Sequence, residues 1–262
     1  MSPRYFDIHS HLNFKQFDAD RDRVIADMER LGIGTILVGT NETTSQESID
    51  LATKHKHFYA TVGTHPCDYD QGLTHVQKQL AGRDEVVAIG ECGIDYFHEH
   101  TVDSERAQKQ LFEAHIDLAL EHDLPLMIHM RPSSGSMDAY HDGLDILEAR
   151  AQTVGEKLRG NSHFFVGDED VARRFLDLGF SCSFDGPITF TREYDDVVRF
   201  MPSDMIHAET DAPFAAPKSN RGKRNEPPFV IEIIEALASI RGEEIDGFVE
   251  ELRENANRMF GI

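Results

Sequence analysis

The chain contains no tryptophan and only three cysteines, Cys67, Cys92 and Cys182, in its 262 residues. An odd number of cysteines without the spacing of a disulfide framework is typical of a reducing compartment, so we expect a cytoplasmic protein. No apolar run approaches the roughly 18 residues of a membrane span. The first residues also lack the charged-then-apolar pattern of a signal peptide. These absences argue against a disulfide-stapled secreted domain and against a membrane protein.

Positive charge is also scarce, because 26 lysines and arginines stand against 47 aspartates and glutamates, for a net charge of −21. A surface of this charge repels polyphosphate at long range, which argues against a protein that coats nucleic acid. It leaves room for an enzyme that holds a nucleic-acid end or a small phosphoester in a local basic cleft. The composition leaves the oligomeric state open and is compatible with a monomer.

Short β-rich apolar runs alternate with longer helical patterns along the chain. The eight runs are Tyr5–Ile8, Thr35–Val38, Phe58–Val62, Val86–Ile89, Leu126–Ile128, His163–Val166, Phe180–Phe184 and Met205–Ala208. Eight strand-then-helix units predict a parallel sheet. At this length a closed (β/α)8 TIM barrel is the economical α/β fold, with residues 1–262 as one domain. An open doubly wound sheet is the structural alternative.

Metal-binding side chains lie at the ends of these runs. His9 and His11 end the first run, and residues two apart in a strand share a face, so both imidazoles would point to one place. The other such residues are His65, Glu91, His129, Glu209 and Asp211, which end later runs, and His163, which begins the sixth. Because strand ends converge on one mouth of a barrel, the sequence predicts a metal site there.

Five segments occur in the order and form of a known family. They are residues 7–12 (DIHSHL), 63–66 (GTHP), 89–96 (IGECGIDY), 209–213 (ETDAP) and 224–227 (RNEP). On these segments the chain resembles the TatD family of metal-dependent hydrolases, within the amidohydrolase superfamily. The resemblance spans nearly the whole chain, and it implies a distorted (β/α)8 barrel that holds two divalent metal ions.

The same resemblance implies a set of metal ligands. His9, His11 and Asp211 would bind the first ion, His129 and His163 the second, and Glu91 would bridge both. A bridging carboxylate suits two ions about 3.5–4 Å apart. Mixed imidazole and carboxylate ligands suit zinc, manganese, iron or nickel better than magnesium.

The reaction that this resemblance implies is phosphodiester hydrolysis, as in a 3′-5′ exodeoxyribonuclease acting on a strand end. Asp211 would orient the attacking water and take its proton. His65 and Arg131 would bind the substrate, since Arg131 lies two residues after His129 and should share its face. Lys223 and Arg224 would join them, from a basic cluster in the irregular segment 211–228.

Departures from the family pattern leave the scissile bond open. Family members commonly have histidine where Cys67 stands, cysteine where Phe164 stands and an acidic residue where Pro132 stands, and the segment 130–143 looks long. One alternative is therefore hydrolysis of another bond at the same metals, in an ester, lactone, amide or aminoacyl ester. A second is a metal-binding barrel without turnover. Cys67 and Cys92 are expected to serve only in packing, and His98 to be a bystander.

Overall fold

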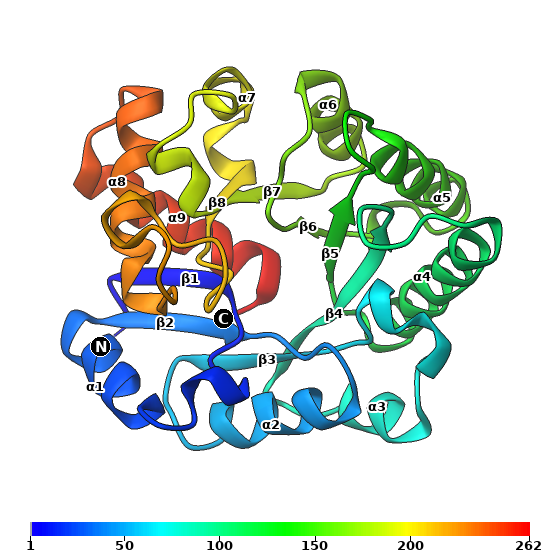
Figure 1. Ribbon diagram of the computed structural model, residues 1–262, viewed down its shortest axis with the longest axis horizontal. Helices are drawn as coiled ribbons and strands as arrows, with labels where there is room; N and C mark the ends of the chain where they lie inside the picture. The colour runs from blue at the N-terminus through cyan, green and yellow to red at the C-terminus, as the bar shows by residue number, and fades with distance from the viewer. Residues whose placement is uncertain (1) are drawn as a thin grey trace.

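In the computed structural model, which describes residues 2–262, eight parallel strands form one sheet in the order β1 to β8 (Figure 1). The strands are β1 (Tyr5–Ser10), β2 (Ile33–Leu37), β3 (Phe58–Val62), β4 (Val86–Asp95), β5 (Leu126–Arg131), β6 (Gly160–Ser162), β7 (Ser181–Phe184) and β8 (Ile206–Ala208). Each strand pairs with the next one along the chain, as the right-handed crossovers of a barrel require.

One helix connects each strand to the next, and two helices follow β8. They are α1 (Arg21–Leu31), α2 (Glu42–Ala52), α3 (His75–Leu80), α4 (Val102–His122), α5 (Asp138–Val154), α6 (Glu169–Asp177), α7 (Asp195–Phe200), α8 (Val230–Arg241) and α9 (Ile245–Phe260). Figure 1 shows α1 to α8 around the strands, whereas α9, in red, lies behind them near the middle of the view. The prediction of a (β/α)8 barrel is confirmed. None of the helices in residues 2–262 is long and apolar enough to cross a membrane.

Short 3-10 turns occupy several loops. They are η1 (Lys15–Phe17), η2 (Pro66–Gln71), η3 (Gly155–Lys157), η4 (Gly186–Thr189), η5 (Ser203–Met205), η6 (Lys218–Asn220) and η7 (Pro227–Phe229). Most of them follow a strand or precede a helix, so they adjust the direction of the chain between barrel elements.

The barrel closes between β1 and the segment after β8 through both backbone and side-chain hydrogen bonds. The backbone nitrogen of His11 donates to the Ala212 carbonyl at 2.7 Å, and that of Asp211 donates to the His9 carbonyl at 2.9 Å. One parallel bridge joins Ser10 to Ala212. The buried carboxylate of Asp7 accepts hydrogen bonds from the backbone nitrogen of Thr210 at 2.9 Å and from its hydroxyl at 2.6 Å. This clamp fixes the segment after β8 beside the end of β1, where His9 and Asp211 both lie.

Two buried apolar clusters stabilise the barrel. The larger one fills the space between strands and surrounding helices, with residues such as Phe112, Phe175 and Ile234 fully buried. In the second, Phe6, Ile8, Ile36 and Met127 pack with Ala256 and Phe260 of α9. Burial of such side chains is the main favourable term in folding.

The fourth strand runs six residues further than its apolar run predicts, to Asp95. The two glycines that interrupt the run are required by the neighbouring strand. A Cβ at Gly90 would lie 2.3 Å from the Met127 carbonyl oxygen, and one at Gly93 would lie 2.0 Å from that of His129. Strand β4 therefore packs its backbone closely against β5, and glycine serves that contact instead of ending the strand.

Two sequence predictions about loops and strands are wrong. The sixth strand is Gly160–Ser162, so His163 follows a strand and does not begin one. The segment 130–143 is not a long loop, because β5 continues to Arg131 and α5 begins at Asp138. Asp138 organises the short connection by accepting a hydrogen bond from the Ser133 backbone nitrogen at 3.0 Å.

Candidate metal centre

The six side chains expected to bind metal converge at the carboxyl ends of the strands. His9 and Glu91 lie in β1 and β4, and His129 lies in β5. His11, His163 and Asp211 occupy the segments that follow β1, β6 and β8. All except His129 are buried, and His129 is half-buried. The fold therefore brings together residues that are up to 202 positions apart, counted from His9 to Asp211.

Glu91 lies between two pairs of histidines and turns one carboxylate oxygen to each pair. Its Oε2 is 3.7 Å from His9 Nε2 and 3.5 Å from His11 Nε2. Its Oε1 is 2.9 Å from His129 Nδ1 and 3.0 Å from His163 Nε2. A carboxylate with this division can bridge two cations that lie a few ångströms apart.

The first group of donors consists of His9, His11 and Asp211. The Nε2 atoms of the two histidines are 3.2 Å apart. Asp211 Oδ1 is 3.7 Å from the Nε2 of His9 and 3.3 Å from that of His11. Ligand atoms at such separations surround a space of the size that a zinc-like ion fills, since its bonds to nitrogen and oxygen are about 2.0–2.2 Å long.

The second group contains His129 and His163, each oriented by a carboxylate on its far side. Their inner atoms, His129 Nδ1 and His163 Nε2, are 3.2 Å apart. The outer Nε2 of His129 is 3.2 Å from Asp95 Oδ2, and the outer Nδ1 of His163 is 3.3 Å from Glu209 Oε1. A carboxylate behind a metal-binding histidine fixes the ring and its tautomer.

These outer hydrogen bonds test whether the residues present fit a cation. A neutral imidazole carries one proton. In His129 and His163 this proton is directed to the outer carboxylate, Asp95 or Glu209, with which the ring forms a hydrogen bond. The inner nitrogen of each ring then carries a lone pair, and the two lone pairs face each other and the Glu91 carboxylate. Burial alone would lower the pKa of His163, but the carboxylates of Glu91 and Glu209 raise it well above its usual value. The site attracts positive charge, and the donor set fits a divalent cation.

A cavity of about 710 Å³ opens over these groups. It is lined by His11, Phe14, Thr40, His65, Asp68, Glu91, Asp95, His98, His129, Met130, Arg131, His163, Phe164, Val166, Pro187, Asp211, Phe214 and Ala215. Its size suits a nucleotide or a molecule of similar volume. Of residues 2–262, Arg131 is the one lysine or arginine that lines it.

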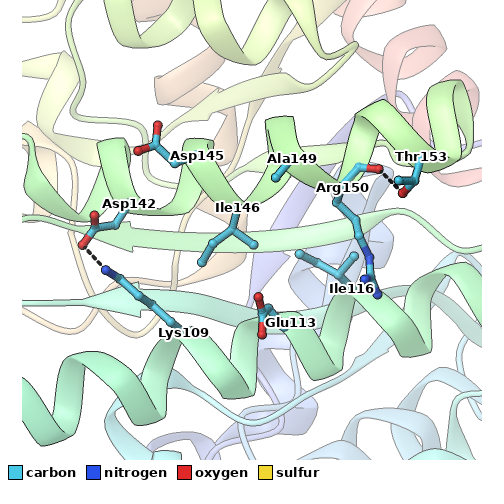
Figure 2. A pocket seen from close by; sticks show the side chains of 9 residues that line it. All are labelled: Lys109, Glu113, Ile116, Asp142, Asp145, Ile146, Ala149, Arg150 and Thr153. Carbon is cyan, nitrogen blue, oxygen red and sulfur yellow. Dashed lines mark hydrogen bonds and ion pairs between the residues drawn. The ribbon is translucent and has the colours of Figure 1, made fainter.

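A second cavity, of about 460 Å³, lies between α4 and α5 and has no comparable chemistry (Figure 2). Four of its charged residues have partners, as Lys109 pairs with Asp142 at 2.8 Å, Asp145 pairs with Arg174 at 2.6 Å and Arg150 pairs with Asp117. None of its lining residues within 2–262 is a histidine or cysteine. The cavity over Glu91 is therefore the candidate site.

Comparison with known proteins agrees with this geometry. A family model described as TatD related DNase matches residues 6–261. The chain belongs to the TatD family. An uncharacterized metal-dependent hydrolase of Bacillus subtilis, YabD, is 36% identical over 265 residues, covering 98% of this chain and 99% of the relative. A 3'-5' ssDNA/RNA exonuclease, TatD of Erwinia billingiae, is 32% identical over 269 residues, covering 98% of this chain and 99% of the relative. The crystal structure of YJJV, a TatD homolog from Escherichia coli, superposes with a TM-score of 0.87 at 25% identity and full coverage of both chains.

Three residues of this TatD-family site have places that the sequence does not predict. Asp95 and Glu209 orient the second histidine pair, although Glu209 is expected only as one of the metal-capable residues, and His98 is expected to be a bystander. His98 lines the cavity, and its Nδ1 is 2.8 Å from Asp95 Oδ2. Asp95 shares a strand with Glu91 four residues away, which is a signal for a shared face, but the apolar run ended before it. Glu209 stood at the end of the eighth run, where metal-capable residues were expected.

The residues expected to bind substrate divide into two pairs. His65 and Arg131 both line the cavity. His65 Nε2 is 3.5 Å from Glu91 Oε1, and burial lowers the pKa of His65 to about 3. The Arg131 guanidinium lies 4.0 Å from the centre of the Phe97 ring. Both side chains therefore lie where they can contact a ligand bound in the cavity.

Lys223 and Arg224 do not line the cavity in the described chain. Arg224 is 2.7 Å from Asp20 Oδ2 and 2.8 Å from Glu226 Oε1, and it lies over the Phe17 ring. Its charge is thus neutralised by contacts that join the loop to the start of α1. Lys223 is exposed. Substrate binding by either residue stays a prediction.

Cys92 and Cys67 differ in their surroundings. Cys92 is fully buried, in agreement with a packing role. The packing prediction is wrong for Cys67, which is exposed, because η2 carries it out of the core. Its Sγ lies 3.6 Å from Asp95 Oδ2. The position where family members commonly have histidine therefore contacts the carboxylate that orients His129.

Proposed function

We propose that this TatD-family protein is a divalent-metal-dependent phosphodiesterase that removes nucleotides from the 3′ end of a single nucleic-acid strand. The observation that carries the proposal is the division of the two Glu91 oxygens between two histidine pairs, 2.9–3.7 Å away. A pair of cations bridged in this way is suited to phosphoryl transfer. The name of the Erwinia relative supports a 3'-5' polarity and a single-stranded substrate.

In this proposal each group of side chains holds one ion. His9, His11 and Asp211 hold the first, His129 and His163 hold the second, and Glu91 contacts both. Zinc, manganese, iron or nickel suits this mixture of imidazole and carboxylate better than magnesium. Bound ions would supply Lewis acidity and lower the pKa of a water towards about 7.

The protein's own groups then divide the work of hydrolysis. Asp211 lines the cavity next to His11, so its carboxylate is placed to orient the attacking water and to accept its proton. His65 and Arg131, on the other side of Glu91, hold the phosphoryl oxygens. His65 is neutral, because burial lowers its pKa to about 3, and contributes a hydrogen bond, while Arg131 balances the charge that develops on these oxygens. Asp95 and Glu209 keep the second histidine pair in the orientation that binds metal.

A second candidate function keeps the metals and changes the bond. Arg131 is the one fixed cation lining the cavity within residues 2–262, which suits a neutral ester, lactone, amide or aminoacyl ester as well as a phosphodiester. A metal-binding barrel without turnover is the third candidate. For the setting of the reaction we favour the cytoplasm, since Cys67, Cys92 and Cys182 are all free.

The experiment that separates these candidates is a substrate panel. Metal-loaded protein is assayed on 3′-labelled single-stranded DNA and RNA, carboxylic esters and lactones, with Glu91→Gln as the control. Cleavage of the strands, lost in the variant, supports the proposal. Cleavage of carboxylic esters or lactones alone favours the second candidate, and no turnover with any substrate favours the third.

A further inference from the structure

Phenylalanine is abundant in this chain, and its exposed members are confined to one place. Of the 17 phenylalanines, all within residues 2–262, only Phe97 and Phe214 are exposed, with 53% and 47% of their surface accessible. Phe97 follows β4 and Phe214 follows β8, so both stand on loops at the carboxyl ends of the strands. Phe214 lines the cavity, and Phe97 is not part of the lining but contacts Arg131, which is. Single exposed apolar residues are normal on a protein surface, but two exposed aromatic rings beside one cavity point to a ligand.

Phe214 begins a row of rings that leads to the first group of metal donors. Its ring centre is 6.5 Å from that of Phe14 and 6.0 Å from that of His11, edge to face in both cases. Phe14 in turn stacks on His11 at 4.4 Å. The backbone nitrogen of Phe214 donates to the Asp211 carbonyl at 2.8 Å, which fixes the ring next to the proposed base.

Phe97 has the corresponding place beside the second group. The planar guanidinium of Arg131 covers one side of its ring at 4.0 Å. Arg131 lies two residues after His129 and lines the cavity. The guanidinium and the ring that it covers therefore stand near the second histidine pair, as Phe214 stands near the first.

Apart from the proposed metal ions, the site offers few cations for phosphate contacts. Asp68, Glu91, Asp95 and Asp211 line the cavity, against Arg131 alone among the lysines and arginines of residues 2–262. The whole chain carries a net charge of −21. A nucleic-acid strand needs another source of affinity here, and stacking of bases on aromatic rings provides it without net charge.

We propose that Phe214 and the Phe97–Arg131 stack are two sites for unpaired nucleobases, one on each side of the bond that is cleaved. The proposal rests on the phosphodiesterase function for the position of the phosphate. It makes stacking, not backbone charge, the main source of strand affinity. A base inside a duplex already stacks on its neighbours and cannot reach these rings, so the two sites also select single strands.

The test compares two DNA strands in zinc-loaded protein. One strand is intact, and the other has tetrahydrofuran abasic units in place of its two 3′-terminal nucleotides. Binding is measured by fluorescence anisotropy in the Asp211→Asn background, where turnover does not interfere. Phe214→Leu keeps an apolar side chain and removes the aromatic face, Phe214→Trp keeps the face, and Phe97→Leu tests the second site. Val102→Ala changes an apolar side chain that is 79% exposed and lies outside the cavity lining.

We expect Phe214→Leu and Phe97→Leu each to raise the Kd of the intact strand about tenfold, which is within the range for loss of one base stack. The Kd of the abasic strand should stay the same, as should both values for Val102→Ala, and Phe214→Trp should bind as wild type. A strand affinity unchanged by both leucine variants, or reduced equally for intact and abasic strands, overturns the proposal. Hydrolysis is measured separately: binding as expected without cleavage rejects the phosphodiesterase, and cleavage without these binding effects rejects the stacking sites alone.

Discussion

His129 is held between two carboxylates, with Nδ1 2.9 Å from Glu91 Oε1 and Nε2 3.2 Å from Asp95 Oδ2. Asp95 is fully buried and also contacts His98 and Cys67. The inner carboxylate is placed to share a cation with the imidazole, while the outer one directs the imidazole proton away from it. In the proposed two-ion site, this arrangement would make Asp95 a positioning residue for the second ion.

Asp95→Asn should therefore weaken metal binding at the second group. Loss of a carboxylate behind a metal-binding histidine reduces affinity by about 10- to 100-fold. Isothermal titration of metal-stripped protein with zinc measures the effect as one weakened site of two. Asp68→Asn is the matched control, because Asp68 lines the same cavity and its side chain has no hydrogen bond to a histidine in the described residues. Equal losses in the two variants would remove the special role of Asp95.

Asp211→Asn should abolish most turnover while the barrel stays folded. The substitution keeps the size of the side chain and removes both a negative charge and a proton acceptor. Loss of general base catalysis lowers kcat by about a hundredfold or more. The measurement is the rate of release from 3′-labelled single-stranded DNA, with circular dichroism as the check on folding. A variant that is folded and as active as wild type would show that another group takes the proton.

His115 should make the fold sensitive to mild acid. It is fully buried, accepts a hydrogen bond from the Thr64 backbone nitrogen at 2.9 Å and pairs with the Leu111 carbonyl at 2.8 Å. Burial lowers the pKa of His115 to about 4 from 6.5. As pH falls below about 6.5, His115 binds a proton in the unfolded chain but not in the folded protein. The free energy of unfolding therefore falls between about pH 6.5 and 4.

The size of this effect can be measured against a variant without the histidine. Between pH 7 and 5 the free energy of unfolding should fall by about 2 kcal/mol more in wild type than in His115→Gln. Urea unfolding at the two pH values supplies both numbers. The opposite order, with the variant more sensitive to acid, would contradict the assigned direction of the pKa shift.

Arg224 and Lys223 should separate in their effects on stability and on substrate binding. Arg224→Gln breaks charged hydrogen bonds to Asp20 and Glu226 that are partly exposed, so unfolding should become easier by about 1 kcal/mol. Its KM for single-stranded DNA should stay near the wild-type value. Lys223→Gln, next to it in the exposed loop, should leave stability unchanged, and a rise in its KM would identify it as the strand contact. A large rise in KM for Arg224→Gln without loss of stability would reverse this assignment.

The sequence alone predicts the architecture because the strands depend on local patterns. The expected metal ligands come from the family resemblance; the structure brings them together, and metal binding by them stays a prediction. The apolar runs are short and regular enough to locate eight strands, and parallel strands bring their ends to one mouth. The sequence predicts that His163 begins a strand, whereas it follows β6. The prediction is wrong because β6 is short and polar. Asn161 in that strand makes its hydrogen bond inside the barrel, to Ser183 Oγ at 2.7 Å, so no apolar pattern marks it.

Contacts between distant segments are what sequence reasoning could not provide. The pairing of Arg224 with Asp20 joins residues 204 positions apart, and nothing in the basic loop distinguishes a paired arginine from a free one. The position of Asp95 is not predicted for a different reason, because in the sequence the glycines of β4 indicate the end of a strand. Their role appears only when the backbone of β5 is in place beside them.

In the proposed function Glu91 joins two cations on which phosphodiester hydrolysis depends, and a count of bound ions made together with a turnover assay tests this. Metal-stripped protein is titrated with zinc and with manganese, bound ions are counted by native mass spectrometry, and the same samples are assayed on 3′-labelled single-stranded DNA. We expect two ions per chain and hydrolysis that appears as the sites fill. In Glu91→Gln, both the binding of two ions and the hydrolysis should be lost. Hydrolysis by metal-stripped protein, or a filled protein that binds no more than one ion, would contradict it.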